Sequence, residues 1–350
     1  MKSLLLKLLL IGGLVFTAVG SPAFAAAEES STFVIAVIPD TQNMVDYSHQ
    51  QGQPTAGGKP FPFDASEQFL GMMRYIAGRS TSRGGDIVFA AAVGDVWQHQ
   101  TEVIDQDHAD RGFAHNPRSP LAMSGAIYPT EETLSYELPK AIEGYRILAG
   151  ADLPFGVAPG NHDYDAMWPD VSFPGDPARL AQLRGYDPDI LGMIHIGGLN
   201  NFNRVFGAEG EFFADKPWYV SSFNGGANSA QVFSAGGYRF LHIALEMHAP
   251  DTALAWAQSV IERFPGLPTI VNTHDYLDTR GERAANPLVD LARIDPDHHN
   301  SAEQLFEKLI APNDQVFMVL CGHHHGQSRR IDDNRAGNKV YQLLADYQSR

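Results

Sequence analysis

Short apolar runs that end directly in polar, ionisable clusters are the feature that most constrains this chain. Five such runs, each typical of a buried β-strand, cover residues 32–38, 86–93, 155–158, 269–272 and 315–320. Segments of helical character lie between several of them, and this alternation predicts an α/β fold. Ligands in such folds bind just outside the carboxyl ends of the strands. We therefore expect the polar clusters to meet in one site although they are far apart in the sequence.

The helical segments are predicted from periodicity and from capping residues. Asp64 can cap a helix in which four apolar residues recur at helical spacing, namely Phe69, Met72, Met73 and Ile76. Further helices are expected over residues 131–149, 251–263 and 302–310, and further strands over residues 238–245 and 340–344.

The domain organisation follows from what lies between these elements. Two stretches, 98–130 and 164–228, have no clear period and are interpreted as insertions. We find no internal repeat and no low-complexity linker, so we predict one α/β domain over residues 26–350.

The first 25 residues have the pattern of a secretory signal peptide. Lys2 and Lys7 give a basic start, an apolar run follows over residues 8–19, and Ala23-Phe24-Ala25 is a cleavage site. The apolar run is shorter than the ~20 residues that a spanning helix needs. We therefore predict a secreted or periplasmic protein with no membrane span after cleavage.

Composition excludes several classes of protein. The 350 residues carry 25 Lys and Arg against 41 Asp and Glu, a net charge of −16, which argues against nucleic-acid binding by bulk charge. A hydrophobic fraction of 44% is typical of a globular protein. The single cysteine, Cys321, excludes an internal disulfide and a Cys-rich zinc site, and we interpret it as a buried residue at a strand end.

The clusters at the strand ends offer oxygen and imidazole donors and no thiolate. They comprise Asp40 and Gln42, Asp95, Asn161 with His162 and Asp163, His274, and His323 with His324 and His325. This set suits Mn, Fe, Zn or Mg better than a soft metal. It exceeds the needs of one four-coordinate ion and is about right for two ions that share a bridging carboxylate. Paired ions can clamp a phosphoryl group and generate hydroxide near neutral pH.

The order of the clusters resembles the calcineurin-like metallophosphoesterase superfamily, in which D-x-H, G-D, G-N-H-D/E, an isolated His and G-H-x-H follow successive strands. The matching segments are Asp40-Thr41-Gln42, Gly94-Asp95, Gly160-Asn161-His162-Asp163, His274 and Gly322-His323-His324-His325. The resemblance extends roughly from residue 32 to residue 346. It implies a four-layer α/β/β/α sandwich with mixed sheets, and an exported enzyme that hydrolyses phosphate mono- or diesters by metal-activated hydroxide.

The resemblance also implies a role for each residue. Two divalent ions (Mn, Fe or Zn) are the expected cofactors, and the ligands of the first would be Asp40, Gln42, Asp95 and His325. The second ion would share Asp95 and would take as further ligands Asn161, His274 and His323. His162 would protonate the leaving oxygen while Asp163 orients its ring. Alternate residues of an extended segment face opposite sides, so His324 should point away from the metals.

One position departs from the superfamily pattern. Gln42 stands where the first motif usually has His, and a neutral amide oxygen binds zinc-like ions more weakly than imidazole does. The substitution bears on the occupancy and identity of the first metal more than on the class of reaction.

Two other functions are alternatives to this one. A non-catalytic, metal-poor binding scaffold of the same fold would be expected to lack several ligands, and only Gln42 deviates. A different hydrolase has no support, because the chain has no G-x-S-x-G, H-E-x-x-H or G-x-x-x-x-G-K-S/T segment. The expected partner is a small-molecule or headgroup phosphoester, with specificity set by the two insertions. The residues leave the oligomeric state open.

The end of the sequence carries a further expectation. Proteins that this chain resembles continue with more strands after the strand-like segment 340–344. We expect a truncated C-terminus, and such a truncation would leave a sheet edge unpaired.

Overall fold

The computed structural model describes residues 32–49, 64–116, 128–170 and 193–347. The predicted signal peptide, residues 1–25, lies outside the described residues. Within the described part, no helix combines the length and the apolar character needed to cross a bilayer.

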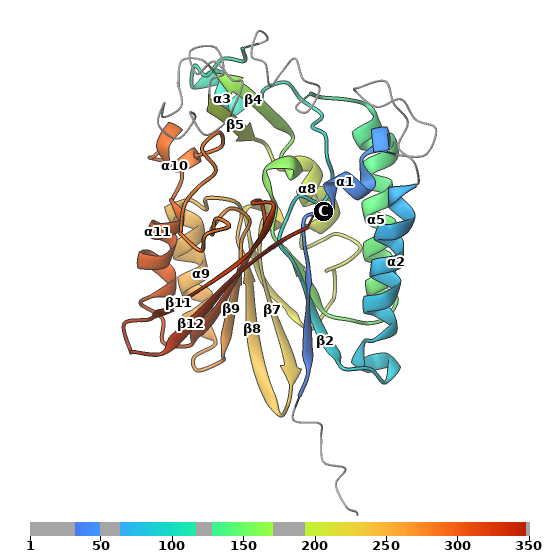
Figure 1. Cartoon of the computed structure of the whole chain (residues 1–350), viewed down its shortest axis with the longest axis vertical. Helices are drawn as coiled ribbons and strands as arrows, with labels where there is room; N and C mark the ends of the chain where they lie inside the picture. Colours follow the sequence, from blue (N-terminus) through green and yellow to red (C-terminus); the bar gives the residue numbers. More distant parts are fainter. Residues whose placement is uncertain (1–31, 50–63, 117–127, 171–192, 348–350) are drawn as a thin grey trace, which may run out of the picture.

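Two β-sheets form the centre of the molecule (Figure 1). The smaller sheet is parallel, has the strand order β1-β2-β3, and consists of β1 (Val34–Ile38), β2 (Ile87–Ala92) and β3 (Phe155–Val157). The larger sheet is mixed and has the order β11-β12-β10-β9-β8-β7-β6. Its strands are β6 (Tyr219–Phe223), β7 (Asn228–Ala235), β8 (Tyr238–Ala244), β9 (Thr269–Asn272), β10 (Val316–Cys321), β11 (Gly326–Asp333) and β12 (Lys339–Asp346).

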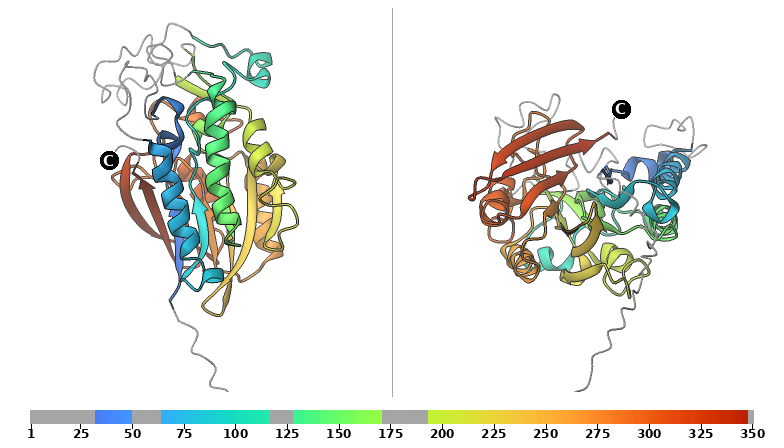
Figure 2. Two further views of the ribbon diagram at one scale, coloured as in Figure 1. Left: turned by 90° about the vertical axis from the view of Figure 1, so that its right-hand side faces the viewer. Right: turned by 90° about the horizontal axis from the view of Figure 1, so that it is seen from below.

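Helices cover the outer face of each sheet, so the molecule has four layers in the order α/β/β/α (Figures 1 and 2). The smaller sheet carries α2 (Ala65–Gly78) and α5 (Leu138–Ala149), and the larger sheet carries α9 (Asp251–Arg263) and α11 (Ala302–Leu305). The predicted fold class is confirmed. The side chain of Asp64 accepts the N–H of Ser66 at 2.9 Å, as expected of the cap of α2.

Strand β2 shows how the sequence builds these layers. Phe89 and Ala91 belong to the apolar cluster between the two sheets, whereas Ala90 and Ala92 belong to the cluster beneath α2 and α5. Successive side chains of a strand point to opposite faces. A strand buried on both faces therefore reads as a continuous apolar run, which is the pattern seen in its sequence.

Short elements from the two insertions lie over the carboxyl ends of the central strands (Figure 1). Strands β4 (Ala166–Asp170) and β5 (Met193–Gly197) pair antiparallel, accompanied by α3 (Gln106–Asp110) and α8 (Asn200–Phe206). The second insertion also supplies β6 to the larger sheet. Further short helical segments at this end of the molecule include α1 (Gln42–Val45), the π-helical turn η3 (Thr133–Glu137) and α10 (Leu291–Ile294).

Segment 340–344 is not itself at the edge of the larger sheet, where β11 is the outermost described strand. Strand β12 lies inside the larger sheet, parallel to β10 on one side and antiparallel to β11 on the other. The chain turns back after β10 to form β11 and β12 as a hairpin, and β12 inserts beside β10.

Candidate metal centre

The carboxyl ends of β1, β2, β3, β9 and β10 bring the predicted clusters together. Asp95 Oδ2 lies 3.2 Å from His274 Nε2, and His323 Nδ1 lies 3.2 Å from the same nitrogen. These three side chains offer ligand atoms that all lie within 4.8 Å of one another. They come from the ends of three strands in two different sheets, so the expected convergence takes place.

Three more predicted ligands surround this group. Asn161 Oδ1 is 3.1 Å from His274 Nε2, and Gln42 Nε2 is 3.0 Å from Asp95 Oδ2. Asp40 Oδ2 is 3.9 Å from His274 Nε2. All of these side chains are almost completely buried.

Glycines allow the strand ends to approach so closely. A Cβ atom on Gly322 would lie 2.1 Å from Asp40 Oδ1, and one on Gly160 would lie 2.2 Å from Asp95 Oδ1. Neither position tolerates a side chain without movement of the carboxylate. Asp95 and His323 adopt left-handed backbone conformations, with φ of 52° and 69°. Such strained residues cluster at functional sites, where the surrounding structure holds them in place.

Hydrogen bonds orient the donor atoms toward one another. His274 Nδ1 donates to the carbonyl oxygen of Val93 at 2.8 Å, which directs Nε2 toward Asp95. A backbone partner of this kind fixes the tautomer of a metal-binding histidine. The N–H of His323 donates to Asp40 Oδ2 at 3.0 Å, so β10 and β1 are tied together beside the centre.

Some donor atoms in the centre have no hydrogen-bond partner within the described structure. They are buried and comprise Asp40 Oδ1, Gln42 Oε1 and His323 Nε2. Buried polar atoms without a partner cost free energy, and such atoms are rare in native proteins. Oxygen and imidazole donors of this kind are ligands of hard and borderline divalent cations. The residues present therefore fit a metal ion.

The pKa shifts in the centre show that its buried carboxylates favour a positive charge beside them. Burial alone would lower the pKa of His274, but Asp95 and Asp40 outweigh it and raise that pKa to about 10. Burial raises the pKa of Asp40 well above its usual value, and the charge of Asp95 adds to this. Burial lowers the pKa of His323 to about 3, which keeps its imidazole neutral and able to bind a cation.

The three consecutive histidines after β10 line two different cavities. His323 and His325 line the same cavity of about 370 Å³ as Gln42, Asp95 and Asn161. His324 Nε2 lies 3.0 Å from Asp275 Oδ1 and lines a different cavity. The expected alternation is present, although His325 is exposed at the cavity mouth.

His162 lies in this cavity, but its ring has a different partner from the one expected. His162 Nδ1 is 2.6 Å from the carbonyl oxygen of Gln98. The carboxylate of Asp163 instead accepts the N–H groups of Val96 and Gly160, each at 2.8 Å. The prediction that Asp163 orients the His162 ring is therefore corrected: Asp163 joins two strand-end loops, and Gln98 orients the ring.

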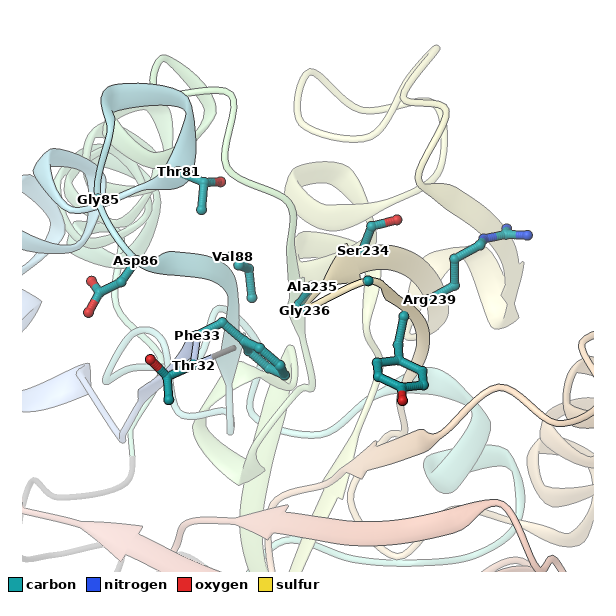
Figure 3. Close-up of a pocket in the computed structure, with 12 residues that line it drawn as sticks. Thr32, Phe33, Thr81, Gly85, Asp86, Val88, Ser234, Ala235, Gly236 and Arg239 are labelled. Carbon is teal, nitrogen blue, oxygen red and sulfur yellow. The ribbon is translucent and has the colours of Figure 1, made fainter. Parts of the chain in front are cut away.

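Another cavity, drawn in Figure 3, lies at the amino end of β1. It has a volume of about 550 Å³ and lies between the start of β1 and the hairpin that joins β7 to β8. Its lining includes one carboxylate, Asp86, and no histidine. The lining of this cavity therefore lacks the donor set that a metal needs.

No family model matches the chain. An uncharacterized protein, YvnB of Bacillus subtilis (strain 168), is 25% identical over 208 residues, which are 58% of this chain and 13% of that protein. The chain thus spans only a small part of this relative's length.

Similar solved structures include a dimetal phosphatase from Danio rerio and the protein TT1561 of Thermus thermophilus. The first has a TM-score of 0.41 and 12% identity, with 91% of this chain and 88% of that chain covered. The second has a TM-score of 0.35 and 10% identity, with 90% and 89% covered. At these values, any assignment of function depends on the residues of the site.

Proposed function

We propose that this protein is an exported, metal-dependent phosphoesterase with two divalent cations in its centre. The observation that carries the proposal is the set of buried, unpartnered donor atoms on Asp40, Gln42 and His323 around the Asp95–His274 pair. A non-catalytic scaffold would have no need to keep such atoms buried, because each costs free energy without a cation.

The donors divide into two groups around Asp95. The ligands of one cation would be Asp40, Gln42, Asp95 and His325, and those of the other would be Asp95, Asn161, His274 and His323. Bound Mn, Fe or Zn would supply positive charge to the phosphoryl oxygens and lower the pKa of a water molecule. The amide of Gln42 can present its oxygen to a cation by rotation about its last side-chain bond, since Oε1 has no other partner.

His162 is suited to protonate the leaving oxygen of the substrate. A carbonyl oxygen can only accept a hydrogen bond, so the contact with Gln98 requires a proton on His162 Nδ1. The other ring nitrogen, Nε2, can then contact a substrate bound in the cavity that His162 lines. A histidine held in this way can act as a general acid when Nε2 is protonated.

The cavity walls suggest how the alcohol part of the ester binds. Met167 and Ile194 from the β4–β5 pair, together with Leu288 and Val289, give the cavity an apolar side. This side would pack against the organic group of a small-molecule or headgroup phosphoester.

A reconstitution experiment tests the proposal. The protein loaded with Mn²⁺ or Zn²⁺ should bind about two ions per chain and hydrolyse p-nitrophenyl phosphate or its bis-ester. His162→Ala should keep the metals and lose roughly 10²- to 10⁴-fold in kcat, because it lacks the proton donor. Asn161→Ala should lose metal.

The control is His298→Ala, which removes a histidine whose side chain is 57% exposed and bonded to Asp295. It should leave turnover and metal content unchanged. A metal-free, inactive wild-type protein would favour the scaffold, and an active His162→Ala variant would exclude His162 as the proton donor.

A further inference from the structure

We propose that Glu137 is a positioning residue that sets the orientation of the His162 ring through the backbone of Gln98. The inference rests on the proposed function, because it concerns the proton donor of that reaction. Glu137 is fully buried and is the last residue of the π-helical turn η3. Such turns occur frequently at functional sites.

The carboxylate of Glu137 is surrounded by donors. Oε2 accepts the N–H groups of Gln98 at 3.2 Å and His99 at 2.9 Å, and Oε1 accepts the N–H of Tyr47 at 3.2 Å. The ring nitrogen His99 Nδ1 lies 2.8 Å from Oε1. Both oxygens are thus fully used by the protein. Glu137, His99 and Asp46 have ligand atoms within 4.8 Å of one another, but this saturation explains the cluster without a cation.

Thr133, in the same π-helical turn as Glu137, contacts the carbonyl groups of the segment that follows Gln98. The Thr133 hydroxyl lies 3.1 Å from the carbonyl oxygens of both His99 and Gln100. Glu137 therefore holds the N–H groups of Gln98 and His99, and Thr133 contacts the carbonyls of His99 and Gln100. The Gln98 carbonyl accepts from His162 Nδ1 at 2.6 Å and, at the longer distance of 3.5 Å, from Gln100 Nε2.

This chain of contacts determines which nitrogen of His162 faces the cavity. A fixed Gln98 carbonyl keeps the proton on Nδ1, so Nε2 is the atom presented to the substrate. Without the Glu137 carboxylate, the buried N–H groups of Gln98 and His99 lose their acceptor and the Gln98 peptide is free to rotate. A shift of about 1 Å in a catalytic group can cost on the order of 10²-fold in rate.

The first test observes the His162 ring directly and does not depend on activity. Nitrogen-15 NMR of the histidine-labelled full chain at about pH 8, assigned with His162→Gln, should show the Nδ1–H tautomer of His162 in the wild type. Glu137→Ala should give a mixture of tautomers. Glu137→Gln should restore Nδ1–H, because its amide oxygen can still accept from Gln98 and His99.

The second test uses kinetics on the metal-loaded enzyme. Glu137→Ala should lower kcat for phenyl phosphate by on the order of 10²-fold, with less effect on p-nitrophenyl phosphate, whose better leaving group needs less help from an acid. Metal content and KM should stay near the wild-type values. Glu137→Gln should recover most of kcat.

The matched control is Glu246→Ala, which removes another buried carboxylate, one that accepts from Asn228 Nδ2 at 2.6 Å. It should leave the tautomer and the leaving-group dependence unchanged.

A second variant covers the case in which Glu137→Ala does not fold. Glu137→Asp retains the charge, with a carboxylate one methylene further from Gln98, and should also give mixed tautomers. An unchanged Nδ1–H tautomer in either folded variant overturns the inference, whereas an inactive wild type with a Glu137-dependent tautomer would reject only the phosphoesterase function.

Discussion

His242 illustrates how burial controls a single residue away from the metal centre. Its ring is fully buried in β8, with Nδ1 at 2.6 Å from Gln231 Oε1 and the ring centroid 4.7 Å from that of Phe89. Because burial penalises the charged imidazolium, the pKa of His242 falls to about 3. The folded protein therefore holds this ring neutral under ordinary conditions.

This predicts an acid-sensitive contribution to stability. The ordinary pKa of 6.5 applies in the unfolded chain, so between about pH 6.5 and pH 3 the unfolded state binds a proton that the folded state does not. The free energy of unfolding should fall by up to about 1.4 kcal/mol per pH unit from this residue as the pH decreases through that window. Urea unfolding at about pH 7 and about pH 4.5 should show a smaller difference for His242→Gln than for the wild type.

The control for this experiment lies in the same strand. Tyr238 is 68% exposed, so Tyr238→Phe should leave the pH dependence as it is in the wild type. Equal pH dependence in His242→Gln and the wild type would contradict the prediction.

Residues of the site differ in how far their sequence reveals them. Asp95 and His274 act through side-chain atoms at strand ends, so residue type and position were enough to predict that they meet. Gln98 acts through its carbonyl and Glu137 through backbone N–H groups of another segment, and neither contact leaves a pattern in residue types. Asp163 follows His162 directly, yet its side chain turns beneath the loop, because adjacency in sequence does not determine hydrogen-bond partners.

The turns after the strands are the elements on which the centre depends. At the end of β10, Gly322 packs so closely that an added Cβ would lie 2.1 Å from Asp40 Oδ1 and 2.7 Å from Val93 Cγ2. The turn therefore links the position of β1 to that of His323.

Gly322→Ala should weaken metal binding. The methyl group must displace either the Asp40 carboxylate or the turn that carries His323, and disturbance of groups that orient ligands typically costs 10- to 100-fold in metal affinity, so a loss of about this size is expected. Calorimetric titration with Mn²⁺ measures the change. Gly78→Ala, at the end of α2 with nothing within 4 Å of an added Cβ, is the control and should bind metal like the wild type. Equal affinities for Gly322→Ala and the wild type would show that the turn can relax.

Elements differed in how well periodicity predicted them. Helix α9 and strand β9 have the predicted bounds, because the buried residues of α9 recur at helical spacing and all four residues of β9 are buried. Strand β4 was hidden within an insertion. All five of its residues are buried, so it lacks alternation, and it contains Pro169, which is uncommon within strands.

For the molecule as a whole, the centre joins the two sheets. Asp40, Asp95 and Asn161 follow strands of the smaller sheet, whereas His274 and His323 follow strands of the larger one. A cation bound by both groups would contact each sheet, in addition to the apolar cluster that packs between them.

Metal binding should therefore raise thermal stability. A ligand that binds only the folded state at 100 times its dissociation constant adds about 2.7 kcal/mol, and Mn²⁺ should increase Tm accordingly. Scanning calorimetry with and without Mn²⁺ measures the shift, and a chelator should reverse it. His323→Ala should show a smaller shift, whereas an identical shift would mean that the ion binds elsewhere.

The distance along the chain between the ligands has a consequence for biogenesis. Asp40 and His323, joined by a hydrogen bond beside the centre, are 283 residues apart in sequence. In a calcium-binding EF-hand, by contrast, one 12-residue loop supplies the ligands and can capture its ion early. Here the proposed ligands come together only after β10 has docked, so loading with metal would mark the completion of folding rather than initiate it.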